Sequence, residues 1–154
     1  MEPIELGRRI VVWGMTGSGK TTLARRLGGH LDLAVVELDA IRHARGWDST
    51  GWDEFAAILE RRLDGAPQGW VSDGSYSHIM HIYLSRADTL IWLHLPWRVS
   101  FWRLFKRSVT RAWTREPVYD EEGPRESWRL LFFDQKSILW WSISQHRAGV
   151  RAVR

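Results

Sequence analysis

The sequence contains no cysteine among its 154 residues. This absence excludes a disulfide framework, a thiolate nucleophile and a zinc-stapled lid. Asparagine is absent as well, so the Asn-Lys-x-Asp element with which switch GTPases recognise guanine cannot occur. No apolar stretch approaches the length of a membrane span, and the first residues lack the charged-then-apolar pattern of a signal peptide. We therefore expect a cytoplasmic protein with no membrane partner.

The charge and aromatic content allow two interpretations each. The chain carries 22 Lys and Arg against 18 Asp and Glu, and this net charge of +4 weakly favours polyanionic partners. Lysine is rare, which coding bias explains, although arginine also suits bidentate phosphate recognition. We expect most of the 11 tryptophans in the core. The alternative is an aromatic, arginine-rich surface for single-stranded nucleic acid.

A complete phosphate-loop motif occupies residues 14–21, which read Gly-Met-Thr-Gly-Ser-Gly-Lys-Thr. It follows an apolar, β-branched run and precedes a stretch with helical spacing, as the motif requires. Its glycines let backbone N–H groups point at phosphate oxygens, Lys20 reaches the β- and γ-phosphates, and the Thr21 hydroxyl can bind Mg²⁺. The residues predicted to bind ATP are Gly14, Thr16, Gly17, Ser18, Gly19, Lys20, Thr21 and Thr22.

Apolar strands alternate with helical segments along the chain, which is typical of parallel strands joined by right-handed crossovers. The predicted strands are 9–13, 33–38, 69–72 and 89–95, with a candidate fifth at 150–153, and the predicted helices are 19–29, 52–63, 75–85, 97–113 and 124–146. We take residues 1–154 as one domain. Ligands of such sheets bind beyond the carboxyl ends of the strands, so the functional face is predicted there.

Two carboxylates, Asp39 and Asp73, follow apolar strands directly and therefore fall on this face. A Mg²⁺–nucleotide site needs carboxylates near the water shell of the metal. A phosphoryl acceptor needs a group that orients or deprotonates its hydroxyl. Taken alone, Asp39 would more often be a helix cap or a loop hydrogen-bonding residue, and Asp73 part of an Asp-Gly turn. Their common place beside the phosphate loop favours a functional role.

Arginines recur at 103, 107, 111 and 115, a spacing that forms one stripe along a helix. Like charges at this spacing repel one another, and a bound triphosphate would offset that repulsion. Arg103 and Arg107 are the predicted contacts to the transferring phosphoryl group. The alternative is a solvated face paired with the acids at 120–122. His94, which falls in an apolar strand, is expected to be a core histidine.

With these residues the chain resembles the adenylate-kinase-like phosphate-loop kinases and, more narrowly, the bacterial DNA topology modulation (FlaR-like) proteins. The resemblance covers most of the chain. It rests on residues 14–22, Glu37-Leu38-Asp39, Gly46-Trp47, residues 70–77, residues 86–96, the arginine stripe and the tryptophan-rich last helix.

This resemblance implies an α/β fold, a three-layer α/β/α phosphate-loop NTPase with a parallel sheet of order 2-3-1-4-5. The polar, acidic segment after the arginine stripe is a candidate lid, around 113–124. The resemblance implies ATP and Mg²⁺ as cofactors. In the family pattern Asp73 and Thr21 support the metal, and Asp39 lies on the acceptor side. The chain departs from the pattern at His78 and Tyr83, where arginines are expected. The arginine that holds AMP in adenylate kinases is also absent, which argues against plain adenylate kinase activity.

Two functions fit these residues. The first is an ATP-dependent kinase that transfers the γ-phosphoryl group to a nucleoside, nucleotide or similar small molecule. Its catalytic residues would be Lys20, Asp39, Asp73, Arg103 and Arg107. The second is a nucleotide-binding regulatory or nucleic-acid-associated protein with weak ATPase activity. The sequence leaves open the acceptor and whether the protein is a homodimer.

Overall fold

The computed structural model describes residues 5–44 and 50–114. The chain divides into two compact units, one with residues 1–14 and 19–93 and the other with 15–18 and 94–154. The predicted lid beyond Thr114, the last helix, the fifth strand, Gly46-Trp47 and Arg115 lie outside the described residues. No helix in the described part of the chain has the length and apolar character needed to cross a membrane.

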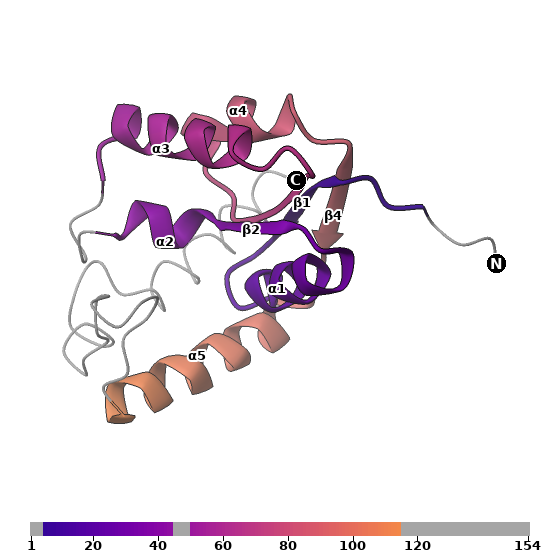
Figure 1. The fold of residues 1–154 in the computed structure, drawn as a ribbon. Coiled ribbons are helices and arrows are strands. Elements are labelled where there is room, and N and C mark those ends of the chain that lie inside the picture. The colour runs from indigo at the N-terminus through magenta and orange to yellow at the C-terminus, as the bar shows by residue number, and fades with distance from the viewer. Residues whose placement is uncertain (1–4, 45–49, 115–154) are drawn as a thin grey trace, which may run out of the picture. The chain divides into compact units, whose positions relative to one another are not determined.

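The strands and helices follow one another in the predicted alternation (Figure 1). They are β1 (Arg9–Gly14), α1 (Lys20–Leu31), β2 (Ala34–Glu37), α2 (Leu38–Arg42), α3 (Trp52–Asp64), β3 (Trp70–Asp73), the 3-10 turn η1 (Ser77–Ile79), α4 (Met80–Leu84), β4 (Thr89–Leu93) and α5 (Trp97–Thr114). All pairings are parallel, and the strand order is β2-β3-β1-β4. The predicted α/β phosphate-loop fold is confirmed, with the order 2-3-1-4 over the strands that the structure describes.

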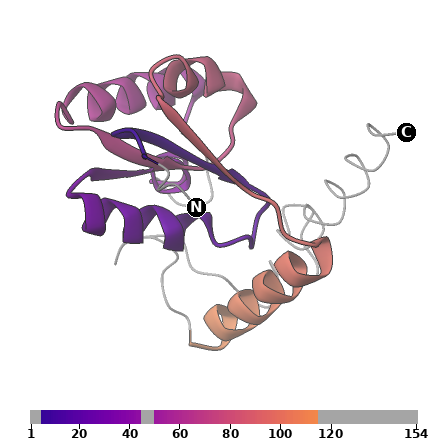
Figure 2. The same ribbon diagram turned by 90° about the vertical axis from the view of Figure 1, so that its right-hand side faces the viewer.

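Helices cover both faces of the sheet in the first unit. Ile10 and Val12 of β1 pack with Ala24 of α1, while Val11 packs on the opposite side with Phe55 of α3. Figure 2 shows this arrangement, with α1 on one side of the sheet and α3 and α4 on the other. Ile10, Val11 and Val12 are therefore buried on alternate faces, which explains why the middle of β1 is apolar on both sides.

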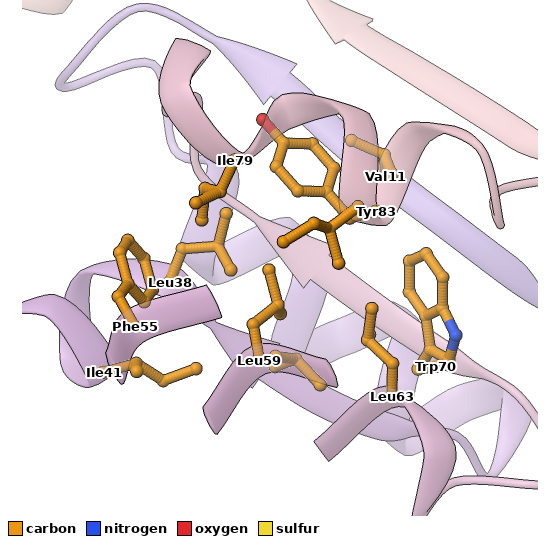
Figure 3. Packing of buried hydrophobic residues seen from close by; sticks show 11 residues of the cluster. Val11, Leu38, Ile41, Phe55, Leu59, Leu63, Trp70, Ile79 and Tyr83 are labelled. Atoms are coloured by element: carbon orange, nitrogen blue, oxygen red, sulfur yellow. The ribbon is translucent and has the colours of Figure 1, made fainter. Parts of the chain in front are cut away.

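The larger core cluster lies between the sheet and helices α3 and α4 (Figure 3). Phe55, Leu59 and Leu63 recur every four residues along α3, and their side chains are 0%, 0% and 4% exposed. Tyr83 of α4 belongs to the same cluster and is fully buried. Burial raises the pKa of Tyr83 to about 12. This departure from the family pattern therefore lies in the core.

We predict that Leu59→Ala lowers the free energy of unfolding by about 2–5 kcal/mol, because it leaves a cavity in this cluster. Arg62→Ala, on the exposed side of the same helix, is the matched control and should change stability by less than about 0.5 kcal/mol. Urea denaturation followed by circular dichroism measures both. Equal midpoints for the two variants would contradict the packing described for α3.

Strand β4 differs from its prediction. It ends at Leu93, two residues early, and His94 beyond it is exposed, so the expected core histidine is wrong. Ile91 and Leu93 pack with the cluster on the α1 side. The other side chains, Leu90 and Trp92, are 58% and 67% exposed. Burial was also wrongly expected for several other tryptophans, since the exposed large side chains include Trp52, Trp102 and Trp113.

Candidate phosphate-transfer site

The phosphate loop has the backbone that its glycines predict. Gly17 and Gly19 have φ values of 82° and 94°, in the left-handed region that favours glycine. Gly19 is the N-cap of α1, and the first turn of that helix contains no acidic residue. Its N-terminal N–H groups and positive dipole end therefore favour an anion such as a phosphate.

Gly17 also packs tightly within the second unit. A Cβ built on Gly17 would lie 2.3 Å from the carbonyl oxygen of Ser100 in α5. We predict that Gly17→Ala weakens ATP binding by roughly 5- to 100-fold, because the clash and the positive φ displace the loop. Gly29→Ala is the matched control, since a Cβ there meets nothing within 4 Å. Calorimetric titration with ATP tests both variants, and equal affinities would contradict this role of Gly17.

The loop and strand β3 meet at Thr21 and Asp73. Thr21 lies in the first turn of α1, and its hydroxyl donates a hydrogen bond to Oδ2 of Asp73 at the end of β3. Asp73 is only 3% exposed, and no described residue forms a hydrogen bond with its Oδ1. The two residues predicted to support the metal are thus in direct contact.

Burial raises the pKa of Asp73 to about 6, from an ordinary value of 3.8. The Thr21 hydrogen bond and the charge of Lys20 act in the opposite direction, whereas the carboxylates of Asp39 and Glu37 add to the increase. The charges of Lys20 and Asp39 therefore act on the pKa of Asp73. The fold brings these groups together although Asp73 is 52 positions from Thr21 in the sequence.

These groups fit a bound Mg²⁺. The Thr21 hydroxyl and the Asp73 carboxylate are hard oxygen ligands of the kind that Mg²⁺ prefers. The buried Oδ1 of Asp73 has no partner in the described residues, and a cation or its water shell would satisfy it. Within the described residues there is no group of three or more His, Asp or Glu side chains arranged to hold a metal. Mg²⁺ in nucleotide sites is usually held by one or two protein groups plus phosphates, so this donor set is sufficient.

Asp39 lies on a short helix rather than at a strand end. Strand β2 ends at Glu37, and α2 begins at Leu38, so the predicted strand 33–38 is too long. The Tyr76 hydroxyl donates a hydrogen bond of 2.6 Å to Oδ1 of Asp39. Glu37 pairs instead with Arg25 of α1, at 2.5 Å. The three neighbouring carboxylates therefore have different partners, and only Asp39 is bound by a neutral tyrosine.

Tyr76, which binds Asp39, belongs to a group of packed aromatic side chains. The Trp52 ring stacks on His78, with centroids 4.3 Å apart, and the guanidinium carbon of Arg42 lies 4.0 Å from the Trp52 ring centroid. Tyr76 packs edge-on against Phe55, with centroids 5.3 Å apart. The sequence interpretation missed Glu37, Arg42, Trp52 and Tyr76. Arg42 was detectable, because it follows Asp39 by three residues and so shares its side of a helix.

The structure also describes the other residues predicted to bind the nucleotide. Arg103 and Arg107 occupy exposed positions of α5 in the second unit, one turn apart as predicted. Ser18 is buried, whereas Thr22 is exposed in the first turn of α1. Their contacts to a nucleotide remain predictions.

No family model matches the chain. A shikimate kinase of Paramagnetospirillum magneticum is 30% identical over 135 residues, which cover 79% of this chain and 66% of that protein. The chain therefore spans slightly less than two thirds of the length of this relative.

Two solved structures are also similar. A sugar kinase from a Janibacter species has a TM-score of 0.45 and 21% identity, over 76% of this chain and 82% of that one. A shikimate kinase from Bacteroides thetaiotaomicron has a TM-score of 0.48 and 19% identity, over 92% and 79%.

Proposed function

We propose that this chain, a member of the P-loop kinases by sequence similarity and strand order, transfers the γ-phosphoryl group of ATP to a hydroxyl of a small molecule. The contact between Thr21 and the buried Asp73 carries the proposal. It couples the phosphate loop to a carboxylate whose Oδ1 has no hydrogen-bond partner among residues 5–44 and 50–114. That combination suits a nucleoside triphosphate with its bound Mg²⁺.

Each residue has a separate task in this proposal. The loop N–H groups and Lys20 bind the β- and γ-phosphates, and Thr21 and Asp73 would hold Mg²⁺. Mg²⁺, when bound, neutralises phosphate oxygens and lowers the barrier to transfer. Asp39 orients the acceptor hydroxyl and accepts its proton, while Tyr76 holds its other carboxylate oxygen. Arg103 and Arg107 would stabilise charge on the transferring group.

Phosphoryl transfer depends on positioning and electrostatics more than on covalent chemistry, so this set of residues is sufficient. The test is ATP consumption against nucleosides, nucleoside monophosphates, sugars and hydroxy acids, with phosphorylated product identified by mass spectrometry. We expect product in a one-to-one ratio with ADP for at least one acceptor. ADP formation that yields only free phosphate with every acceptor would contradict the proposal.

A nucleic-acid-associated function, in keeping with the topology-modulation resemblance, is the second candidate. The observation that favours it is the exposed side of α5, where Trp102 and Trp113 are 55% and 79% exposed and the Lys106 ammonium lies 5.2 Å from the Trp102 ring centroid. Exposed aromatic and basic side chains bind single strands by stacking and charge. This function predicts affinity for single-stranded DNA or RNA that falls steeply with salt. Binding that does not change with salt would contradict it.

A further inference from the structure

Tyr76 lies in the segment between strand β3 and the 3-10 turn η1. Its hydroxyl donates a hydrogen bond of 2.6 Å to Oδ1 of Asp39, which belongs to the short helix α2. Leu38 and Ile41 anchor that helix, since both are buried in the core cluster, where Figure 3 shows them beside Phe55. The fold thus places a tyrosine hydroxyl from one segment on the carboxylate proposed to bind the acceptor.

Two rings of α3 fix the orientation of the Tyr76 side chain. Phe55 packs edge-on against it, with centroids 5.3 Å apart and an interplanar angle of 88°, and Trp52 does so at 6.2 Å and 65°. Phe55 is fully buried, so the Tyr76 ring rests on the packed core. The Ile79 amide donates a hydrogen bond to the carbonyl of Tyr76, which fixes its backbone. Edge-on aromatic contacts favour one ring orientation, and the hydroxyl is therefore held at Asp39 before a ligand binds.

The hydrogen bond divides the two carboxylate oxygens of Asp39 between different tasks. Oδ1 accepts the bond from Tyr76, and residues 5–44 and 50–114 supply no second hydrogen bond to this half-buried carboxylate. Oδ2 is therefore the oxygen left for an acceptor hydroxyl. A bond to one oxygen also restricts the rotation of the carboxylate, which is otherwise a broad, two-fold torsion. A base must lie within hydrogen-bond reach of the proton that it accepts, so this restriction bears directly on phosphoryl transfer.

A kinase must also prevent transfer of the phosphoryl group to water. Water is smaller than any acceptor, and a base that accepts a proton from an acceptor hydroxyl can accept one from water as well. The Tyr76 hydroxyl takes the place of a water molecule at Oδ1 of Asp39. Removal of this hydroxyl would open Oδ1 to solvent, because Asp39 is only half-buried. Exclusion of water from an active site suppresses hydrolysis of this kind.

We propose that Tyr76 is a positioning residue, which aims Oδ2 of Asp39 at the acceptor hydroxyl and keeps water away from Oδ1, so that the phosphoryl group passes to the acceptor rather than to water. In the productive step the acceptor oxygen forms a bond to the γ-phosphorus. The bond from that phosphorus to the bridging oxygen of ADP breaks, and the acceptor proton goes to Oδ2. Hydrolysis is the same step with water in place of the acceptor. This inference rests on the proposed kinase function.

The experiment uses Tyr76→Phe, which removes the hydroxyl and keeps the ring in its contacts with Phe55 and Trp52. Tyr83→Phe is the matched control, because it removes a hydroxyl from the core cluster on which Tyr76 packs. Asp39→Asn and the double variant with Tyr76→Phe and Asp39→Asn show whether Tyr76 acts through Asp39. For each protein, ADP and phosphorylated product are measured with and without the acceptor, and kcat and KM are determined. Circular dichroism confirms that each variant is folded.

We expect Tyr76→Phe to lower kcat for transfer roughly 10- to 100-fold, the usual effect of losing a hydrogen bond to a charged group. KM for ATP and for the acceptor should change by less than about threefold, since neither ligand loses a contact. ADP formation without acceptor should rise roughly 3- to 10-fold, because water gains the freed oxygen. In the Asp39→Asn background, Tyr76→Phe should change either rate by less than about twofold, and Tyr83→Phe should match wild type.

The outcomes separate this inference from the proposed function. If wild type phosphorylates an acceptor but acceptor-free ADP formation stays equal or falls in Tyr76→Phe, the inference is overturned and the kinase is left intact. A wild type that phosphorylates no acceptor contradicts the kinase. The inference then stands if ADP formation still rises in Tyr76→Phe and does not rise in the double variant, and it fails with any other result.

Discussion

Lys20→Ala is expected to lower kcat/KM for phosphoryl transfer by roughly 10²–10³-fold, which is the usual loss when one charged or hydrogen-bonding group is removed from a transition state. Lys20 follows the left-handed Gly19 and begins α1, so in the proposed site its ammonium would act next to the N–H groups that bind the phosphates. Negative charge on the transferring group must be stabilised in place, and no other described lysine lies in the first unit. The measurement is steady-state kinetics with the best acceptor found.

The control for Lys20→Ala is Arg26→Ala, which removes an exposed positive charge later in the same helix and should leave kcat/KM within about twofold. Lys20→Arg separates charge from geometry. A guanidinium keeps the positive charge but replaces a compact point charge with a planar fork, so only partial activity is expected. If Lys20→Ala transferred phosphate as fast as Arg26→Ala, the phosphate loop would not be the ATP site.

The phosphate loop and the parallel α/β topology were predictable because both depend on local patterns, whereas the strand order was predicted from the family resemblance. The glycine, lysine and threonine spacing of residues 14–21 is contiguous, and the strand-helix alternation restricts the topology to few choices. The positive φ of Gly17 and Gly19 and the position of Asp73 at the end of β3 followed from these patterns. Asp73 and Thr21 also approach each other because parallel strands end at the same edge.

The contacts around Asp39 were not predictable in the same way. The hydrogen bond from Tyr76 joins residues 37 positions apart, and no local pattern specifies it. The placement of Arg42 on Trp52 depends on how α2 and α3 pack. Hydropathy likewise failed for Trp92 and His94, because the burial of these side chains depends on which helix covers each face of the sheet and not on the strand alone.

Asp73→Asn is expected to affect activity and stability in opposite directions. Loss of the carboxylate removes the charge beside Thr21 that we propose to support the metal, so kcat/KM should fall by roughly 10²–10³-fold. The ligand-free protein should nevertheless become more stable at pH 7, because an ionised carboxylate that is 3% exposed is costly to bury. The pKa increase from 3.8 to about 6 corresponds to up to about 3 kcal/mol.

The pH dependence of the unfolding free energy shows whether the buried carboxylate causes this difference in stability. The folded protein holds the Asp73 proton up to about pH 6, whereas the unfolded chain releases it near pH 3.8, so the folded state binds more protons between these values. Wild-type stability should therefore fall as pH rises through this window, and Asp73→Asn should lack that fall. The two proteins should be nearly equal near pH 4, and the gap should be largest above pH 7. Urea denaturation across this range measures it, with the exposed Glu60→Gln as control.

Bound Mg²⁺ and ATP should reverse the order of stability. A cation beside Asp73 favours the ionised form, so the burial cost becomes a source of ligand affinity. Saturating MgATP should raise the melting temperature of wild type by several degrees more than that of Asp73→Asn. A variant that is both less stable than wild type at pH 7 and equally stabilised by MgATP would show that Asp73 is a structural turn residue. A variant that is more stable than wild type at pH 7 but less stabilised by MgATP would show that the buried carboxylate lowers stability and contributes to ligand binding.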